Sequence, residues 1–172
     1  MKKSDIHPMP EYLDRYINLV PDVPLQDAFR GSLLQIDACN ISLLEERGLY
    51  SYETGKWTVK EVLQHITDCE RIMCYRGLLI ARGDLTVAAG FEPDLLAENS
   101  NANNRHVSEI LDELKKVRLA TIALFDSFSS EVLQRRGINW KYEINVLALG
   151  FTIPGHQSWH FKILRDVYKQ AI

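Results

Sequence analysis

Apolar residues recur at intervals of three and four along most of this chain, a spacing that leaves few folds open to it. The period belongs to helices that bury one face and expose the other. It predicts four long helices, over residues 24–47, 58–82 and 105–128 and in a final segment that ends near Gln170. Since no convincing hairpin signal interrupts them, we expect an all-α fold: an up-down-type four-helix bundle in a single domain spanning residues 1–172.

The second of these helices has the clearest start. Thr58 and Glu61 have the spacing of a capping box, in which each side chain accepts a hydrogen bond from the other residue's backbone N–H. Trp57 and Val62 are placed to pack together as the accompanying hydrophobic staple. The apolar stripe then continues to Gly83, a residue type typical of helix ends.

Other segments are less regular. Residues 11–20 carry a short helical stripe. Residues 84–104 have no clear period and are interpreted either as a lid over a functional site or as a plain connection. Residues 138–146 are predicted to be a loop that leads into the last helix, with a short strand as the alternative. Pro154 should kink or begin that helix, because proline lacks the N–H that helical hydrogen bonding needs.

Charge and composition exclude several classes of protein. The formal net charge is −3, which argues against a nucleic-acid-binding role because phosphate contacts need a basic surface. No apolar run reaches the roughly 18 residues of a membrane span, and the N-terminus lacks the apolar core of a signal peptide. Three cysteines without CxxC spacing indicate reduced thiols. We therefore expect a cytoplasmic protein without membrane or nucleic-acid partners.

Three histidines carry the strongest chemical signal. His156 and His160 are four residues apart, so on a helix they project from one face, as two ligands of one metal ion do. His65 lies on the inward stripe of another predicted helix and is able to complete the site. Three imidazoles suit Zn, Ni, Fe or Mn and leave positions for water or substrate. The alternative is a set of buried polar residues that only hydrogen-bond to one another.

Four further residues are secondary candidates. Gln157 stands where the HExxH motif of zinc proteases has its glutamate, and an amide is no general base, so proteolysis of that type is disfavoured. Asp68 is placed either to orient an imidazole or to be a solvated charge on the helix, and Cys69 either to approach the same site or to serve as a buried thiol. Arg76 points inward and should pair with Glu70 or with a substrate anion.

At these residues the sequence resembles the DinB/YfiT-like family of metal-binding four-helix bundles. The resemblance spans most of the chain and is strongest over residues 55–65, 68–72 and 75–76, with His156 and His160 as later matches. It implies that His65, His156 and His160 are the metal triad. The chain differs from many relatives at Gln157, where they have Glu, and at Trp159, where they have His; neither difference removes a ligand.

The resemblance also implies what the site does. Some relatives are described as thiol S-transferases that join a low-molecular-weight thiol to an electrophile, others as metal-dependent hydrolases, and a homodimer is typical. The first hypothesis is therefore an enzyme that activates a thiol or water for attack on a small substrate, with Arg76 holding an anionic part of it. The second hypothesis is a non-catalytic metal- or ligand-binding stress-response protein, because Gln157 replaces the best candidate for a general base.

Overall fold

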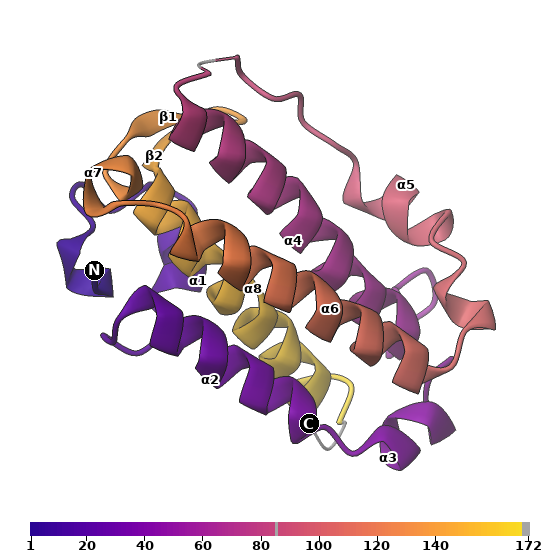
Figure 1. Cartoon of the computed structure of the whole chain (residues 1–172). Coiled ribbons are helices and arrows are strands. Elements are labelled where there is room, and N and C mark those ends of the chain that lie inside the picture. The colour runs from indigo at the N-terminus through magenta and orange to yellow at the C-terminus, as the bar shows by residue number, and fades with distance from the viewer. Residues whose placement is uncertain (85, 170–172) are drawn as a thin grey trace.

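A computed structural model describes residues 1–84 and 86–169, and it contains the expected bundle (Figure 1). In this part of the chain, the four long helices are α2 (Leu25–Asp37), α4 (Val59–Arg82), α6 (Val107–Asp126) and α8 (Val146–Asp166). Helix α4 packs against both α6 and α8, and α2 packs against the same two helices from the other side. The prediction of an all-α four-helix bundle is confirmed, with a small hairpin in addition to the helices.

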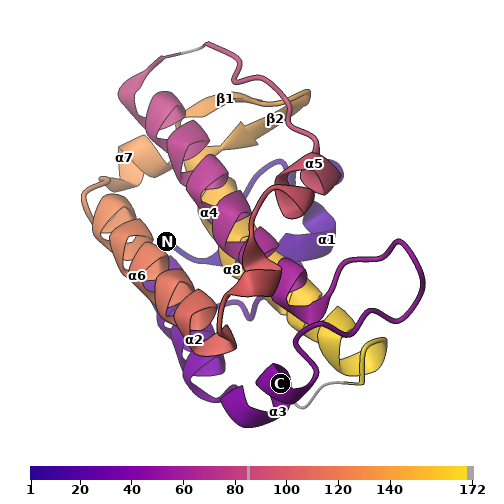
Figure 2. The ribbon, with the colours of Figure 1, turned by 90° about the vertical axis from the view of Figure 1, so that its right-hand side faces the viewer.

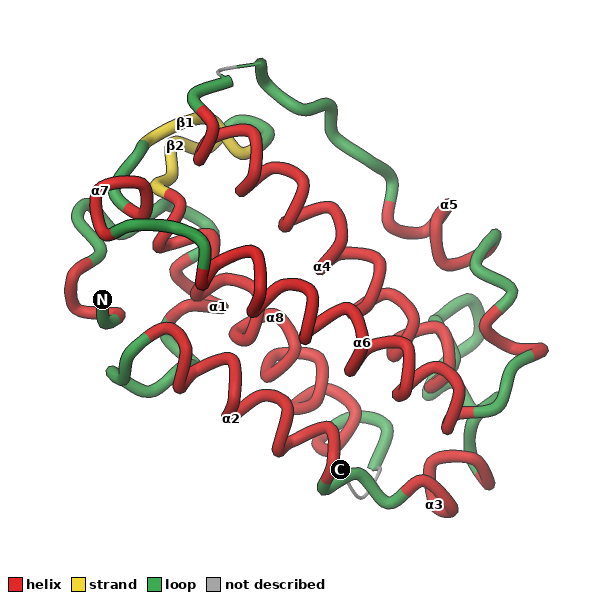
Figure 3. Tube along the Cα trace, viewed as in Figure 1, coloured by secondary structure: helices red, strands yellow, loops and turns green. Residues whose placement is uncertain are grey.

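Shorter elements close the two ends of the bundle (Figures 1 and 3). Helix α7 and the strand pair lie at one end, α3 lies at the other, and α5 lies beside α4, as Figure 2 shows. The bounds of these elements are η1 (Lys3–Asp5), α1 (Asp14–Ile17), α3 (Ile41–Glu46), α5 (Pro93–Glu98), η2 (Ala102–Asn104), α7 (Ser130–Leu133), β1 (Arg136–Asn139) and β2 (Tyr142–Asn145).

The predicted start and end of α4 are both confirmed. The Thr58 backbone N–H donates to Glu61 Oε2 at 2.7 Å, and the Glu61 N–H donates to Thr58 Oγ1 at 3.1 Å. At the other end Gly83 adopts φ 80°, the left-handed conformation that terminates helices and that glycine accepts without strain. These two caps define where α4, the helix that carries His65, begins and ends.

The preferred prediction of a loop over residues 138–146 is wrong, and the alternative, strand structure in this segment, is confirmed. Strands β1 and β2 pair antiparallel as a hairpin, in a register that sets Asn139 opposite Tyr142. The turn is made by Trp140 and Lys141, and Trp140 has φ 61°. Two-residue hairpin turns are usually recognised in a sequence by Asn-Gly or Asp-Gly. Neither pair occurs at this turn, so the sequence contains no turn signal there.

Two predicted helix boundaries also need correction. The helix expected over residues 24–47 is divided between α2 and α3, because the Asn40 side chain accepts from the Leu43 N–H and starts a new helix there. The last helix begins at Asn145, its N-cap, and runs through Pro154 without starting there. It ends at Asp166, before the expected end near Gln170, which itself lies outside the described residues.

Residues 84–104 and residues 11–20 differ from their predicted structures. Residues 84–104 contain α5, which has Pro93 in its first turn, and η2, so they are not a structureless lid. The helical stripe over residues 11–20 is reduced to the single turn of α1. Among the described residues, no helix combines the length and apolar character needed to cross a bilayer.

The core is divided into two apolar clusters with buried polar residues between them. One cluster contains Phe29 of α2, Phe125 of α6 and Phe151 of α8, towards the hairpin end. The other contains Leu63 of α4 and Leu164 of α8. Along α8, the histidines at 156 and 160 fall between the two clusters, so the candidate site occupies the middle of the bundle.

Candidate metal centre

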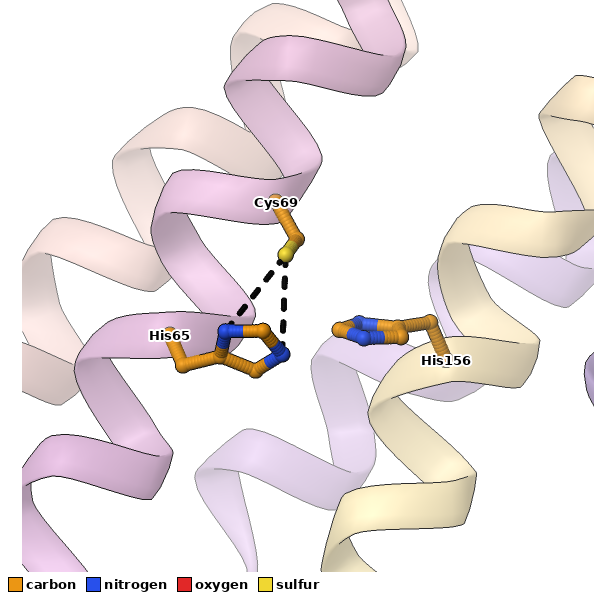
Figure 4. Close-up of side chains that lie close together, drawn as sticks. All are labelled: His65, Cys69 and His156. Atoms are coloured by element: carbon orange, nitrogen blue, oxygen red, sulfur yellow. Dashed lines mark hydrogen bonds between the residues drawn. The ribbon is translucent and has the colours of Figure 1, made fainter. Parts of the chain in front are cut away.

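The three histidines predicted as ligands lie together between α4 and α8. His156 Nε2 and His160 Nε2 are 3.1 Å apart. The His65 ring centroid lies 5.1 Å from that of His156 and 4.8 Å from that of His160. Figure 4 shows His65 and His156 extending toward each other from the two helices. The i, i+4 spacing on α8 and the inward stripe on α4 thus bring these imidazoles together.

Cys69 lies at the same point, one turn along α4 from His65. Its Sγ is 3.6 Å from His65 Nδ1 and 3.5 Å from His65 Nε2 (dashed lines in Figure 4). Potential ligand atoms of His65, Cys69 and His156 lie within 4.8 Å of one another. These three residues could hold a metal ion, and His160 lies next to His156 on α8.

Burial keeps the imidazoles in the neutral form that binds metal. It lowers the pKa of His65 to about 4, and burial together with the neighbouring His65 lowers the pKa of His160 to about 3. The pKa of His156 falls well below its ordinary value, first through burial and then through the neighbouring histidines and Arg118. Burial has the opposite consequence for Cys69, since it raises the pKa of that thiol to about 12.

The spacing of His156 and His160 suits two ligands of one divalent metal ion. Two nitrogens bound at about 2.0–2.1 Å in a tetrahedral site lie roughly 3.3 Å apart. The 3.1 Å between His156 Nε2 and His160 Nε2 is close to that value. Neutral imidazoles suit Zn, Ni, Fe or Mn.

Aromatic side chains hold the imidazoles in place. The Trp57 ring lies 4.6 Å from the His65 ring, and Tyr16 makes edge contacts with His156 and Trp159 at 5.3 and 5.7 Å. Tyr16 reaches this position because α1 packs directly on α8 at Gly155, where a Cβ atom would come within 2.3 Å of the Tyr16 carbonyl oxygen. A glycine next to His156 is therefore required for this wall of the site.

A cavity of about 520 Å³ opens beside the histidines. Its walls come from α1, α4, α8, the hairpin and the segment that precedes α5. Aromatic rings line much of it: Tyr12, Tyr16, Trp57, Phe91, Trp140, Tyr142 and Trp159. The volume is in the range of small-molecule sites.

Arg76 lies in the wall of this cavity, on the same helix as His65 and Cys69. Its Nη1 donates to Asn139 Oδ1 at 2.7 Å, and its Nη2 donates to the Ala89 carbonyl at 2.8 Å. Arg76 therefore connects α4 to the hairpin and to the segment before α5. It does not pair with Glu70, whose carboxylate binds Arg118 through Nε and Nη2, both at 2.8 Å.

Gln157 and Asp68, two secondary candidates for the site, form hydrogen bonds with residues outside it. Gln157 is fully buried, and its Nε2 donates to the Ser32 carbonyl at 2.9 Å, so it fastens α8 to α2. Asp68 Oδ1 accepts from Gln64 Nε2 at 3.1 Å and contacts Arg71. In the described part of the chain, neither side chain forms a hydrogen bond or ion pair with the three imidazoles.

Sequence reasoning missed most of the cavity wall. Asn139, Trp140 and Tyr142 belong to the unpredicted hairpin, and Tyr12 stacks on Tyr142 with ring centroids 5.2 Å apart. The one available signal was the density of aromatic residues at 12–16 and 140–142. That signal does not say which ring faces a cavity.

Comparison with known proteins agrees with this arrangement. The family model described as the DinB superfamily matches residues 36–164, a range that contains α4, α6, most of α8 and all three histidines. The chain belongs to the DinB superfamily. None of the curated proteins compared matches it.

A solved structure shares the fold of this DinB-superfamily chain. It is described as "YfiT from Bacillus subtilis is a probable metal-dependent hydrolase with an unusual four-helix bundle topology". The two chains are 19% identical and superpose with a TM-score of 0.63, over 94% of this chain and 90% of the other. At that identity the likeness establishes the fold.

Proposed function

We propose that this chain is a metal-dependent enzyme that attacks a small electrophilic substrate with a thiol or a water molecule. The observation that carries the proposal is the convergence of three neutral imidazoles at the wall of a cavity large enough for a small molecule. The metal-dependent hydrolase description of the YfiT structure supports it. A low-molecular-weight thiol is the preferred nucleophile, as in S-transferases, and water is the alternative.

His65, His156 and His160 would hold the metal. A divalent metal at such a site lowers the pKa of a water or thiol bound to it, so that a nucleophile is available near neutral pH. The protein supplies the rest: α4 and α8 fix the imidazoles, and the aromatic walls give the cavity an apolar lining for a small substrate. The residue next to His156 is Gln157, which takes no part in this chemistry because its side chain is held in a hydrogen bond to α2.

His160 is a better third ligand than Cys69 on physical grounds. The histidine is already in its ligating, neutral form, whereas a thiol with its pKa raised to about 12 must lose a proton to bind. The 3.5 Å distance from Cys69 Sγ to His65 Nε2 is that of a hydrogen bond involving sulfur. Cys69 is therefore proposed to position the His65 ring.

The test is metal analysis of untagged protein together with five alanine variants. Near-stoichiometric metal is expected in the wild-type chain, in Cys69→Ala and in the control His106→Ala, whose side chain is 77% exposed. We expect loss of the metal in His65→Ala, His156→Ala and His160→Ala. Loss in Cys69→Ala with retention in His160→Ala would show that Cys69 is the third ligand.

Activity is then screened with metal-loaded and chelator-treated protein. The screen pairs a low-molecular-weight thiol with an aryl halide electrophile, and it measures hydrolysis of activated esters and amides in parallel. Thiol conjugation that requires metal and fails in His65→Ala is the expected result. Metal binding without acceleration of any reaction would favour the non-catalytic alternative. A homodimer remains a prediction, which sedimentation analysis of the same samples tests.

A further inference from the structure

We propose that Arg76 forms an anion subsite in this cavity, and that the substrate is a small monocarboxylate with an apolar or aromatic body. The inference rests on the proposed function, since it names the class of molecule that the metal-dependent reaction takes. The observation behind it is independent of the metal: a buried guanidinium in the cavity wall has neutral partners and no counterion.

The hydrogen bonds of Arg76 leave part of its donor capacity unused. The residue is 7% exposed, and its recorded acceptors are one amide oxygen, of Asn139, and one carbonyl oxygen, of Ala89. A guanidinium carries five N–H groups, so each Nη keeps a second one. The Nε atom is buried and has no hydrogen-bond partner among the described residues.

The charge of Arg76 is likewise uncompensated. No carboxylate in the described part of the chain lies within ion-pair distance of it, although every other buried arginine or lysine there has one: Arg118 pairs with Glu70, and Lys60 pairs with Glu45. A buried cation without a counterion is costly, and such groups are normally paired. The Phe91 ring, 5.6 Å from Arg76 Cζ, offsets a small part of that cost. Burial accordingly lowers the pKa of Arg76.

The cavity defines the rest of the ligand. Arg76 is the one arginine or lysine among the described residues that line it, and the one carboxylate there, of the exposed Glu92, forms no ion pair with Arg76. A single buried cation balances a single negative charge, which favours a carboxylate over a phosphate dianion. The aromatic walls between Arg76 and the histidines suit an apolar body. His65 and Arg76 are eleven residues apart on α4, about three turns, so both lie on the helix face that lines the cavity. The proposed orientation places the carboxylate at Arg76 and the rest of the molecule toward the histidines.

The test compares the binding of 3-phenylpropionate with that of its uncharged amide analogue, 3-phenylpropionamide, by calorimetric titration of metal-free protein. Chelation matters, because a carboxylate also binds metal directly. We expect the carboxylate to bind at least tenfold more tightly than the amide, and Arg76→Gln to abolish that preference. Arg82→Gln, which removes an exposed arginine from the end of the same helix, should leave the preference unchanged. Equal binding of the two probes to wild-type protein, or an unchanged preference in Arg76→Gln, would overturn the proposal.

A second variant keeps the test decisive if Arg76→Gln does not fold. Asn139→Asp places a carboxylate at the atom that now accepts from Arg76 Nη1, so it supplies the missing counterion. We expect this variant to keep its fold, to melt no lower than wild type and to lose the preference for the carboxylate probe. A retained preference would contradict the proposal.

The two proposals fail separately. His65→Ala lacks a metal ligand but keeps Arg76, so it should still prefer the carboxylate in the metal-free assay. If the preference is found and no metal-dependent reaction is, the anion subsite stands and the proposed function fails. If metal-dependent turnover is found and neither probe is preferred, the proposed function stands and the anion subsite fails.

Discussion

Burial of a single histidine, His65, makes the folded protein less stable at acid pH. An unfolded histidine titrates near pH 6.5, whereas burial lowers the pKa of His65 in the folded protein to about 4. Between those values the unfolded state binds more protons than the folded state, so the free energy of unfolding falls as the pH falls. The loss begins near pH 6.5 and is complete near pH 4, reaching on the order of 3 kcal/mol for His65 alone.

Urea unfolding of metal-free protein between pH 7 and pH 4.5 measures this loss. We expect His65→Asn to lose less free energy of unfolding over that range than the wild-type chain. The exposed His106 provides the control, and His106→Asn should follow the wild-type curve. Parallel curves for wild type and His65→Asn would contradict the assigned burial effect.

Residue spacing on helices explains which site residues were predictable. His156 and His160 are separated by about one turn, so they share a face, and one observation of spacing was enough to place them together. Gln157 follows His156 by one residue, a rotation of about 100°, and that rotation turns it toward α2. The expected pairing of Glu70 with Arg76 failed for the same reason, since six residues do not return a helix to the same face.

At the level of elements, a buried ion pair joins three of the long helices. Arg118 of α6 is fully buried, binds both carboxylate oxygens of Glu70 on α4 and donates to Ser32 Oγ on α2. Thr121 Oγ1 also donates to Glu70, at 2.6 Å. Removing one partner of such a pair leaves an uncompensated buried charge, whereas replacing both with neutral residues does not.

Arg118→Met should therefore lower the free energy of unfolding by about 3–5 kcal/mol. The double variant Glu70→Gln with Arg118→Met should recover much of that loss. Arg71→Met is the matched control, because Arg71 is about half exposed and an exposed ion pair contributes at most about 1 kcal/mol. Urea unfolding of the four proteins decides the matter: a loss in Arg118→Met no larger than in Arg71→Met would contradict the role of the pair.

Elements were predictable where local chemistry decides them. The capping box at Thr58 fixed the start of α4 because both partners lie within four residues of each other. The hairpin was not predictable, since its turn uses Trp140 and Lys141 and its stability comes from contacts with distant residues such as Tyr12. The division between α2 and α3 depends on one Asn40 cap inside a continuous apolar pattern.

The whole molecule assembles the cavity from segments that are far apart in the chain. Residues 12–16, α4, the segment before α5, the hairpin and α8 each contribute part of the wall. No periodicity within one segment encodes such a meeting, which is why the cavity could not be derived from the sequence although its histidines could. Gly90 and Gly155 both lie at close approaches between these segments, and they differ in which atom an added side chain would meet.

At Gly90 an added Cβ would lie 2.9 Å from Nε1 of Trp140, a side chain that is 48% exposed and free to shift. At Gly155 it would lie 2.3 Å from the Tyr16 carbonyl oxygen, which belongs to backbone packed between α1 and α8. Helix propensity alone favours alanine at position 155 by up to about 1 kcal/mol, so the clash decides the sign of the effect there.

We expect Gly155→Ala to lower the free energy of unfolding by about 1–3 kcal/mol, the usual cost of overpacking, and to weaken metal binding because Tyr16 and His156 are displaced together. Gly90→Ala should change the free energy of unfolding by less than about 1 kcal/mol and leave the metal content unchanged, since the indole can move aside. Urea unfolding and metal analysis of the two variants measure both effects. A Gly155→Ala protein as stable as wild type would mean that α1 is not held against α8 as tightly as its backbone contact requires, and the wall that orients His156 would then need another source.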